Sequence, residues 1–376
     1  MRIAIRVDAS IQVGIGHFMR CLTLADALKQ RGAQIRFISR LLPQHLQNML
    51  VAKGHQFMSL DRSSIEGISD NLAQSNWLGT SQHADAQDTV QALSDQAWDW
   101  LVVDHYALDS RWETALRLTA KNILAIDDLA NRQHDCDILL DQNYYHDLSR
   151  RYQGLLPERC VNLLGLAYVL LRPEFIEAKQ RLRARDGIVQ RILVFLGGSD
   201  HTNQTQKVVK ALKQLNISDI KVDVVVGSAN PNRNAIQALC DELPNITFHC
   251  QISNMAELIC NADLGVGAGG SAMWERCYLG LPTITVVFAA NQVRTTEDVA
   301  DIGAIEYLGW SDSLGSDDYA KAITEMIDNS QRVKQIGDAA LGLLKMSSTS
   351  VVDAMLSLMQ RDAHFYSGRA ASSGAA

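Results

Sequence analysis

The sequence contains the same arrangement twice: an apolar strand-like segment, a glycine-containing loop and a helix-like segment. The first copy starts with β-rich residues 2–8, continues through loop 13–17 and enters an amphipathic stretch at 17–31. The second copy starts with the apolar run 191–196, followed by the turn 197–200. Strands that alternate with helix-length segments are typical of a parallel sheet covered by helices. The pattern therefore predicts an α/β protein with two Rossmann-like domains.

Further strand-like segments, separated by helix-length segments, occur in both halves. Strands are expected at residues 34–39, 100–104, 123–126 and 137–140, and again at 221–226, 246–248, 263–267 and 283–287. Residues 62–88 are instead polar and weakly periodic, which predicts a long loop.

Two domains also suit the length, because 376 residues exceed what one hydrophobic core usually supports. The predicted segments are an N-terminal domain at 1–170, a linker at 171–190, a C-terminal domain at 191–335, a helix at 336–360 and a tail at 361–376. The linker is placed where the charged stretch EAKQRLRARD interrupts the alternation. The last helical pattern is expected to cross back onto the N-terminal domain. The tail has no apolar periodicity, which is typical of disorder.

Charge and hydropathy argue against several classes of partner. A formal net charge of −7 disfavours general nucleic-acid binding, which requires a basic surface. No apolar run approaches the roughly 18 residues of a membrane span, and the first residues read as a strand rather than a signal peptide. We therefore expect a cytoplasmic protein without nucleic-acid or membrane partners, in which helix N-termini and a few arginines hold any anionic ligand. The oligomeric state stays open, with a monomer as one option.

The seven cysteines are odd in number and include no C-x-x-C pair. They are Cys21, Cys136, Cys160, Cys240, Cys250, Cys260 and Cys277. Most lie among apolar residues, so reduced, buried thiols are expected.

The loop after the first strand contains Gly14, Gly16 and His17. Glycines allow a tight turn and a close approach to a ligand, and the helix N-terminus offers free amide donors. The spacing is not G-x-G-x-x-G, which disfavours a dinucleotide site. A helix N-terminus disfavours an imidazolium, so His17 is expected to be neutral and able to accept a proton. The alternative is that His17 only caps the helix or packs in the loop.

A second glycine-rich loop, residues 267–270, leads into Ser271, Ala272 and Glu275. Its amides could receive a diphosphate, and Glu275, about one turn into the helix, could reach a ribose diol. The alternative is a tight strand-to-helix turn without a ligand. The turn 197–200 is equally open, because it either holds a phosphate or uses Asp200 as a helix cap.

Several polar residues follow other strands. Tyr106 comes after a strand end, where it either binds a sugar or water or packs as an aromatic. Asp127 and Asp128 have no histidine or cysteine at metal-ligand spacing, so capping of a turn is favoured and no metal site is predicted. Asn291 and Gln292 begin a helix whose amide side chains face the expected ligand. The chain contains no G-x-S-x-G, H-E-x-x-H or G-K-[ST] motif, which argues against α/β-hydrolases, zincins and P-loop enzymes.

Six separated motifs occur in one order over about residues 1–310. They read GIGHFMRCLTLADAL, VDHYALD, AIDDLANRQHDCDILLDQN, LLRPEF, FLGGSD and GAGGSAMWERCYLGLPTITVVFAANQ. Together they resemble the PseG family, the UDP-2,4-diacetamido-2,4,6-trideoxy-β-L-altropyranose hydrolases of bacterial pseudaminic acid synthesis. The second half alone also resembles MurG-like glycosyltransferases, and GIGH and DHY in the first half favour the hydrolases. Residues 62–88 and the extension past about Leu308 depart from the family pattern.

The resemblance implies a GT-B-like fold with parallel sheets facing a central cleft. It also implies hydrolysis of the C1–O bond of the UDP-sugar with inversion, with neither metal nor cofactor. His17 would be the general base, and Tyr106 and Asn291 would position the sugar or the water. The residues that would bind the substrate or UDP are Gly14, Gly16, Arg172, Gly198, Gly270, Ser271, Ala272, Glu275 and Gln292. For Arg172, a structural pairing with Glu174 is the alternative.

Two other functions remain open from the sequence. A GT-B glycosyltransferase would use the same donor site and transfer the sugar to a hydroxyl acceptor. A non-catalytic sugar-nucleotide-binding protein would need no histidine base. An acceptor-free incubation with the UDP-sugar separates these readings.

Overall fold

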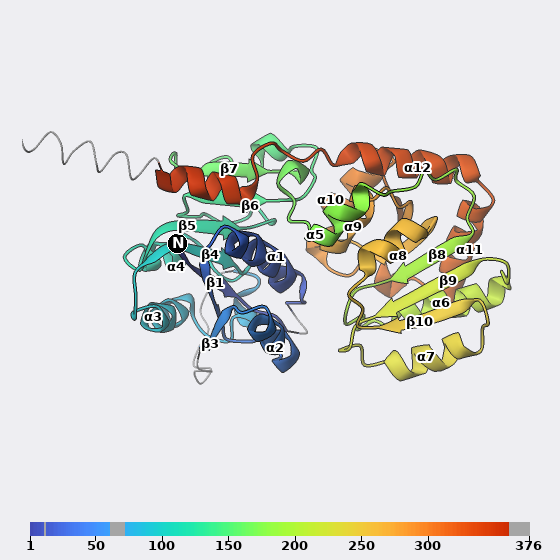
Figure 1. Ribbon diagram of the computed structural model, residues 1–376, viewed down its shortest axis with the longest axis horizontal. Coiled ribbons are helices and arrows are strands. Elements are labelled where there is room, and N and C mark those ends of the chain that lie inside the picture. Colours follow the sequence, from blue (N-terminus) through green and yellow to red (C-terminus); the bar gives the residue numbers. More distant parts are fainter. Residues whose placement is uncertain (11–12, 61–71, 361–376) are drawn as a thin grey trace, which may run out of the picture. The chain divides into compact units, whose positions relative to one another are not determined.

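The computed structural model describes residues 1–10, 13–60 and 72–360. It divides into two compact units (Figure 1). The N-terminal unit contains Met1–Gln142, Asp147–Leu170 and the chain from Met346 on, and the C-terminal unit contains Asn143–His146 and Leu171–Lys345. The predicted tail at 361–376 lies outside the described residues.

The N-terminal unit is built on a parallel seven-stranded sheet in the order β3-β2-β1-β4-β5-β6-β7. The strands are β1 (Arg2–Val7), β2 (Gln34–Ser39), β3 (Gln56–Ser59), β4 (Trp98–Asp104), β5 (Ala120–Ile126), β6 (Ile138–Asp141) and β7 (Val161–Leu164). The central strands are buried along nearly their whole length, which explains their continuous apolar sequences. In register, Ile5 of β1 lies between Phe37 and Val102.

Helices cover both faces of this sheet. They are α1 (Gly16–Gln30), α2 (Gln44–Ala52), α3 (Gln82–Ala92) and α4 (Ser110–Leu116), with short 3₁₀ turns at Ser75–Trp77, Leu148–Arg150 and Leu166–Tyr168. Ile3 and Ile5 of β1 pack in one apolar cluster with α1 and α2. Ala4, whose side chain points the other way, belongs to a cluster with α3 and α4. The unit is thus a three-layer α/β/α arrangement.

Helix α3 lies partly in the segment for which a loop was predicted, so that prediction is wrong from Gln82 onward. The helix was missed because its buried face is polar. Asp85 is fully buried, binds the fully buried Arg6 of β1 through two hydrogen bonds and also accepts from Trp112. Arg40 adds a second guanidinium to the same carboxylate. This ion-pair cluster fixes α3 to the sheet without an apolar stripe in the sequence.

The C-terminal unit contains a parallel six-stranded sheet in the order β10-β9-β8-β11-β12-β13. Its strands are β8 (Arg191–Phe195), β9 (Lys221–Val226), β10 (Ile246–Cys250), β11 (Leu264–Ala268), β12 (Thr283–Val287) and β13 (Glu306–Trp310). Its helices are α5 (Pro173–Lys179), α6 (Gln204–Leu215), α7 (Arg233–Asp241), α8 (Met255–Asn261), α9 (Ser271–Tyr278), α10 (Ala290–Asp301), α11 (Ser316–Ile327) and α12 (Ser330–Leu343), with a 3₁₀ turn at Ser311–Ser313. Ile192 and Val194 of β8 pack with α6, α7, α11 and α12 on one face.

The predicted linker at 171–190 is not a separate segment, because it folds as part of the C-terminal unit. Its helix α5 packs against α8 and α9. Arg185 then donates hydrogen bonds to the carbonyls of Ile259, Ala262 and Leu279, near the ends of these two helices. A helix end leaves such carbonyls without intrahelical partners, so the charged stretch caps two helices.

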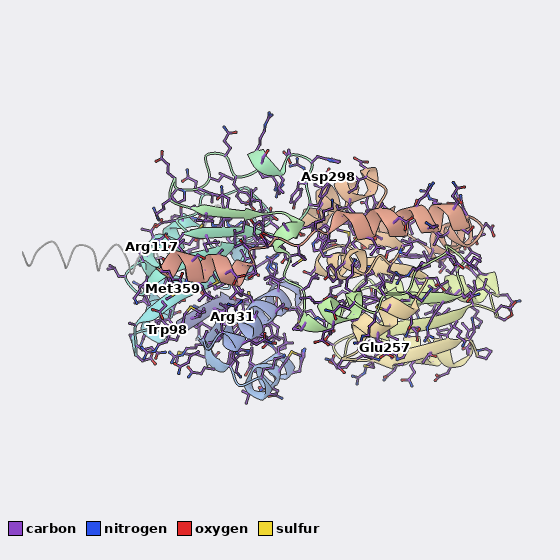
Figure 2. All side chains as sticks on the ribbon, turned by 45° about the horizontal axis from the view of Figure 1, so that its top comes forward. Arg31, Trp98, Arg117, Glu257, Asp298 and Met359 are labelled. Carbon is purple, nitrogen blue, oxygen red and sulfur yellow. The ribbon has the colours of Figure 1, made fainter. Side chains whose placement is uncertain are left out.

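The helical pattern predicted for 336–360 consists of two helices. Helix α12 ends at Leu343 within the C-terminal unit, and residues 351–360 form another helix in the N-terminal unit. Val351 and Met355 pack in the same cluster as β1, with Met359 beside them (Figure 2). The new helix starts where Ser350 accepts from the amide of Asp353 and Asp353 accepts from the amide of Ser350. This capping box is the local signal that separates the two helices.

Candidate active site

Both sheets have the strand order in which the chain leaves the first strand toward one edge and later crosses back to the other side. Ligands in open α/β sheets bind at the carboxyl ends of the strands where this reversal occurs. In the N-terminal unit that place lies between β1 and β4. His17 is in the first turn of α1, after β1, and Asp104 is the last residue of β4.

The His17 imidazole is held by Asp104. Its Nδ1 lies 2.6 Å from Oδ1 of Asp104, and the ring is 7 % exposed. Nη2 of Arg20 also lies 3.1 Å from Nδ1. A carboxylate and a guanidinium cannot both be partners of one ring nitrogen, because the first only accepts and the second only donates. The short contact to the carboxylate places the proton on Nδ1, so the lone pair of the neutral ring is on Nε2.

Asp104 is kept ionised by its neighbours. Burial alone would raise the pKa of this carboxyl, but the Arg20 guanidinium and the His17 ring outweigh burial and hold the pKa well below its usual range. Arg20 donates to both carboxylate oxygens of Asp104, at 2.6 and 2.7 Å, and to Asp128 at 2.9 Å. The ionised form of Asp104 is the form that can orient a histidine base.

Tyr106 packs its ring edge-on against His17, with 4.5 Å between centroids. Its hydroxyl donates to Oδ1 of Asp128 at 2.5 Å. Burial and the Asp128 charge raise the pKa of the phenol well above its usual value, so Tyr106 keeps its proton. The structure thus gives Tyr106 a contact with the imidazole through its ring and commits its hydroxyl proton to Asp128.

The glycine loop leads directly into α1. Gly14 has φ +76°, a conformation that favours glycine, and its amide donates to the carbonyl of Ser10. Gly16 is the first residue of α1, and Ile15 at the N-cap position makes no side-chain capping hydrogen bond. Gly14, Gly16 and His17 therefore lie together, as the sequence predicted.

The second glycine-rich loop lies after β11, at the equivalent reversal point of the C-terminal sheet. Gly270 is the N-cap of α9 with φ +81°, and as a glycine it has no side chain that could cap this helix. A side chain at Gly270 would also meet Nε2 of Gln292 at 3.4 Å. Gln292 lies beside the loop and accepts from the amide of Phe288 at 3.0 Å. Ser271 is exposed and Ala272 half-buried, so the start of α9 is open to a ligand.

Glu275 is one turn into α9 and forms an ion pair with Arg172, whose Nε and Nη2 lie 3.2 and 3.1 Å from Oε1. Arg172 also pairs with Glu174 at 3.0 Å and stacks on Phe175. The alternative that pairs Arg172 with Glu174 is confirmed, and contact of Arg172 with a ligand stays a prediction. Burial raises the pKa of Glu275, opposed by the Arg172 charge.

Arg276, the next residue, is a buried cation that the sequence did not single out. Its Nη2 donates to the carbonyl of Ala268 at 2.5 Å, whereas Nε and Nη1 have no hydrogen-bond partner within the described residues. Burial lowers the pKa of this guanidinium to about 10. A Cβ atom at Gly267 would lie 2.6 Å from Cζ of Arg276, which explains the glycine there. A positive charge therefore lies directly behind the loop that precedes α9.

A small pocket lies next to Glu275 in the same unit. Its lining residues are Leu193, Phe195, Met255, Ile259, Ala272, Glu275 and Arg276. Its volume of about 190 Å³ is smaller than that of a typical small-molecule site, which is roughly 300–1,000 Å³.

In the turn after β8, the side chain of Asp200 caps the start of α6. Asp200 is buried and accepts from the amides of Gln204 and Thr205, both at 2.8 Å. These amides start α6 and are therefore committed to Asp200 rather than to a phosphate. Gly198 is half-buried, and its carbonyl lies against Gly227, where a Cβ atom would come within 2.2 Å. The cap interpretation of this turn is favoured.

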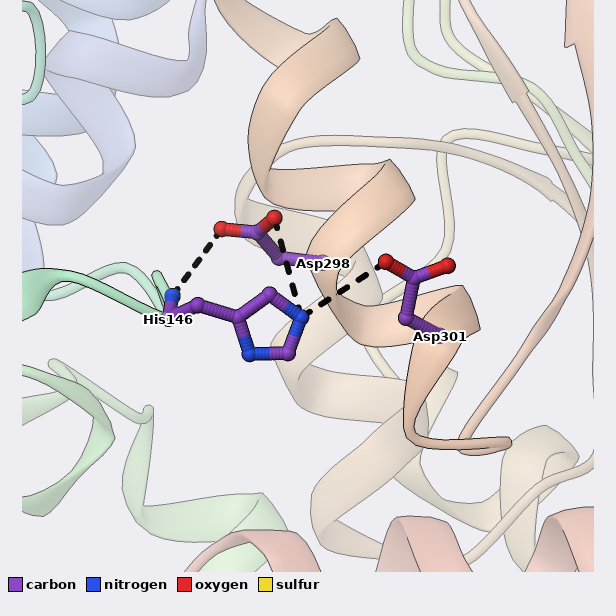
Figure 3. A group of neighbouring side chains, drawn as sticks. All are labelled: His146, Asp298 and Asp301. Carbon is purple, nitrogen blue, oxygen red and sulfur yellow. Dashed lines mark hydrogen bonds and ion pairs between the residues drawn. The ribbon is translucent and has the colours of Figure 1, made fainter.

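The remaining candidate, Asn291, is the second residue of α10 and is half-buried. Farther along α10, Asp298 and Asp301 face His146, with three candidate metal-ligand atoms within 4.8 Å of one another (Figure 3). Nε2 of His146 lies 3.8 and 3.6 Å from the carboxylates, too far for hydrogen bonds. These side chains could hold a divalent cation, but Asp301 is 73 % exposed, which makes such a site weak.

The sequence motifs did not identify Asp104 and Asp128 as the carboxylates that bind His17 and Arg20. Asp104 ends β4 and Asp128 follows β5, and Arg20 lies three residues after His17, on the same side of α1. The three-residue spacing of His17 and Arg20 was the sequence signal from which their shared contact with Asp104 could have been predicted. Asp127, by contrast, caps the turn at Ala130, as predicted, and also pairs with Arg132.

Comparisons with known proteins agree with this architecture. The model of the glycosyltransferase family 28 C-terminal domain matches residues 192–355. The crystal structure of Acinetobacter baumannii MurG is similar with a TM-score of 0.63 and 16% identity, covering 96% of this chain and 100% of that chain. The predicted GT-B-like fold, with two parallel sheets and covering helices, is therefore confirmed.

Two curated proteins are similar over most of the chain. One is the UDP-2,4-diacetamido-2,4,6-trideoxy-β-L-altropyranose hydrolase of Campylobacter jejuni, 24% identical over 82% of this chain and 99% of that protein. The other is the spore coat polysaccharide biosynthesis protein SpsG of Bacillus subtilis, 24% identical over 82% of this chain and 84% of that protein. Within the described residues, no helix is both long and apolar enough to cross a membrane.

Proposed function

We propose that the protein hydrolyses the C1–O glycosyl bond of a UDP-sugar, with His17 as the general base. The observation that carries this function is the Asp104–His17 pair. It leaves Nε2 without a hydrogen-bond partner among the described residues, at the carboxyl ends of β1 and β4. A buried carboxylate that fixes the tautomer of a histidine is a known way to prepare a base. The similar Campylobacter hydrolase suggests UDP-2,4-diacetamido-2,4,6-trideoxy-β-L-altropyranose as the substrate.

In the proposed reaction, Nε2 of His17 takes a proton from water as the water oxygen attacks C1 of the sugar. The C1–O bond to the diphosphate breaks, and its electron pair leaves with UDP, so attack from the opposite face inverts the anomeric centre. Asp104 stabilises the imidazolium that forms. Tyr106 limits the orientations of the ring through its edge contact, and Asn291 is proposed to position the sugar or the water.

The leaving group needs a site for its developing charge. We assign the diphosphate to the amides at Gly270, Ser271 and Ala272, where the N-cap of α9 is a glycine and Arg276 adds a buried positive charge. Glu275 would then accept from the ribose hydroxyls while Arg172 balances its charge. Gln292 borders the same loop and would contact the same ligand. In this scheme the carbon–oxygen bond breaks without a metal ion.

A glycosyltransferase is the second candidate, favoured by the match of residues 192–355 to a glycosyltransferase domain. One experiment separates the two. The purified protein is incubated with the UDP-diacetamido sugar in EDTA without any acceptor, and proton NMR follows the anomeric signals. Release of UDP and the free sugar, with the inverted anomer appearing first, is the expected result. Turnover that needs an added hydroxyl acceptor would instead identify a transferase, and absence of any turnover would rule out both.

A further inference from the structure

Two of the seven cysteines lie in contact just before two neighbouring strands of the N-terminal unit. Sγ of Cys136 and Sγ of Cys160 are 3.6 Å apart, although 24 positions separate the two residues. Cys136 comes two residues before β6 and Cys160 directly before β7, and these strands pair in parallel. Backbone hydrogen bonding holds the two segments in register, because the amide of Val161 donates to the carbonyl of Asp137 at 2.8 Å.

The two thiols differ in access. Cys136 is fully buried, whereas Cys160 is half-exposed. The hydrogen bond between them lowers the pKa of Cys160 and raises that of Cys136. The accessible sulfur is therefore also the one that ionises more easily, and thiolates are the form that oxidants attack. The buried sulfur is close enough to react next.

We propose that Cys136 and Cys160 form an oxidisable thiol pair, in which a hydroperoxide attacks Cys160 first and Cys136 then closes a disulfide. In the first step the Cys160 thiolate attacks the peroxide, the O–O bond breaks, and an alcohol or water leaves after protonation. Cys160 becomes a sulfenic acid. In the second step the Cys136 sulfur attacks Sγ of Cys160, the S–O bond breaks, and water leaves with the Cys136 proton. Two thiols and one hydroperoxide thus give one disulfide, one alcohol and one water.

The disulfide would join the two strands from which the chain leaves the N-terminal unit. Strand β6 runs on to Asn143, and β7 leads to Leu171, the residues at which the chain enters the C-terminal unit. Strand β7 is also the edge of its sheet, paired on one side only. A disulfide beside β7 would tie this edge strand to β6, in addition to the hydrogen bonds on its one paired side. The pair lies at the amino ends of the strands, whereas His17 and Asp104 are at the carboxyl ends, so oxidation does not consume the proposed base.

The test uses the full chain treated with graded hydrogen peroxide, quenched by alkylation and mapped by mass spectrometry without reduction. We expect a linked peptide pair containing Cys136 and Cys160, about 2 Da lighter than the two reduced peptides together. Closing a loop of this size should also raise Tm by roughly 5–10 °C, reversibly with dithiothreitol. In Cys136→Ser, Cys160 should instead be trapped by a sulfenic-acid reagent such as dimedone. In Cys160→Ser, Cys136 should stay reduced.

Cys250 supplies the matched control, because it is an exposed cysteine of the other unit. Cys250→Ser should leave the cross-link and the change in Tm as they are in the wild type. The pair should also be oxidised at least about tenfold faster than Cys250, since a resolving thiol removes the intermediate. The idea is overturned if wild-type Cys160 accumulates as sulfinic acid without the link. Oxidation of Cys160 at the rate of Cys250 would overturn it as well, and neither result depends on whether a variant folds.

Discussion

His17→Asn tests the proposed base most directly. Asparagine keeps a polar group near Asp104 but has no atom that can take a proton from water. General base catalysis is worth about 10²–10⁴-fold, which corresponds to about 3–5 kcal/mol in the activation free energy. The structural cost should be small, because the two hydrogen bonds from Arg20 still hold the Asp104 carboxylate. Loss of one hydrogen bond then costs about 1 kcal/mol of stability.

The measurements are UDP release from the UDP-diacetamido sugar, UDP affinity by calorimetry, and Tm. We expect turnover to fall at least 100-fold while UDP affinity stays within about twofold, because the groups assigned to UDP belong to the other unit. His55→Asn is the matched control. His55 is a buried histidine of the same unit, bonded to Asp26 at 2.8 Å, with no proposed part in the reaction. Turnover of His17→Asn within tenfold of wild type, or an equal fall in both variants, would refute the assignment.

Three further substitutions test other buried charged groups. Asp104→Asn should lower turnover about 10³–10⁴-fold, since the amide no longer fixes the tautomer, and should also lower Tm because Arg20 loses a buried partner; unchanged turnover would contradict this role. Arg276→Met should weaken UDP binding about tenfold in calorimetry while Tm stays equal or rises, because an unsatisfied buried cation is removed; equal affinity would separate Arg276 from the diphosphate. The pKa of His134 is about 9 because the charges of Glu113 and Asp127 outweigh burial. The raised folded-state value stabilises the fold fully below pH 6.5, and this contribution of about 3 kcal/mol is lost as the pH rises to about 9. Chemical denaturation from pH 6 to 10 should show the loss in wild type and not in His134→Gln.

The central strands could be predicted because both their faces are buried. A strand such as β8 is a continuous apolar run, and a glycine turn marks its end. Three of the four edge strands, β3, β7 and β13, were not predicted, since they are short and only partly buried. The fourth, β10, was predicted over residues 246–248. Helix α3 was not predicted because its buried face carries Asp85 and Gln82 rather than a stripe of apolar residues.

The positions of the two glycine loops could be predicted from the sequence, but the ion pairs of the candidate site could not. Local sequence places His17 at a helix N-terminus, and the strand order then places Asp104 next to it. Arg20, one of the partners of Asp128, is 108 positions away from it, and no spacing rule connects residues at that distance. Arg276 was missed because a charged residue on an amphipathic helix is expected to be exposed. In the structure, Arg276 donates to the carbonyl of Ala268 and lies against Gly267, contacts that the local sequence does not indicate.

The charges around His17 suggest why Arg20 has two acidic partners. With a neutral imidazole, Arg20, Asp104 and Asp128 together carry one net negative charge. When His17 accepts a proton, the four groups become neutral as a set, and no net charge is left in a buried place. A single carboxylate shared by Arg20 and the imidazolium would instead leave a buried positive charge, which costs several kcal/mol. In the proposed reaction, Asp128 therefore supplies the second negative charge, so that Asp104 can pair with His17 while Arg20 stays paired.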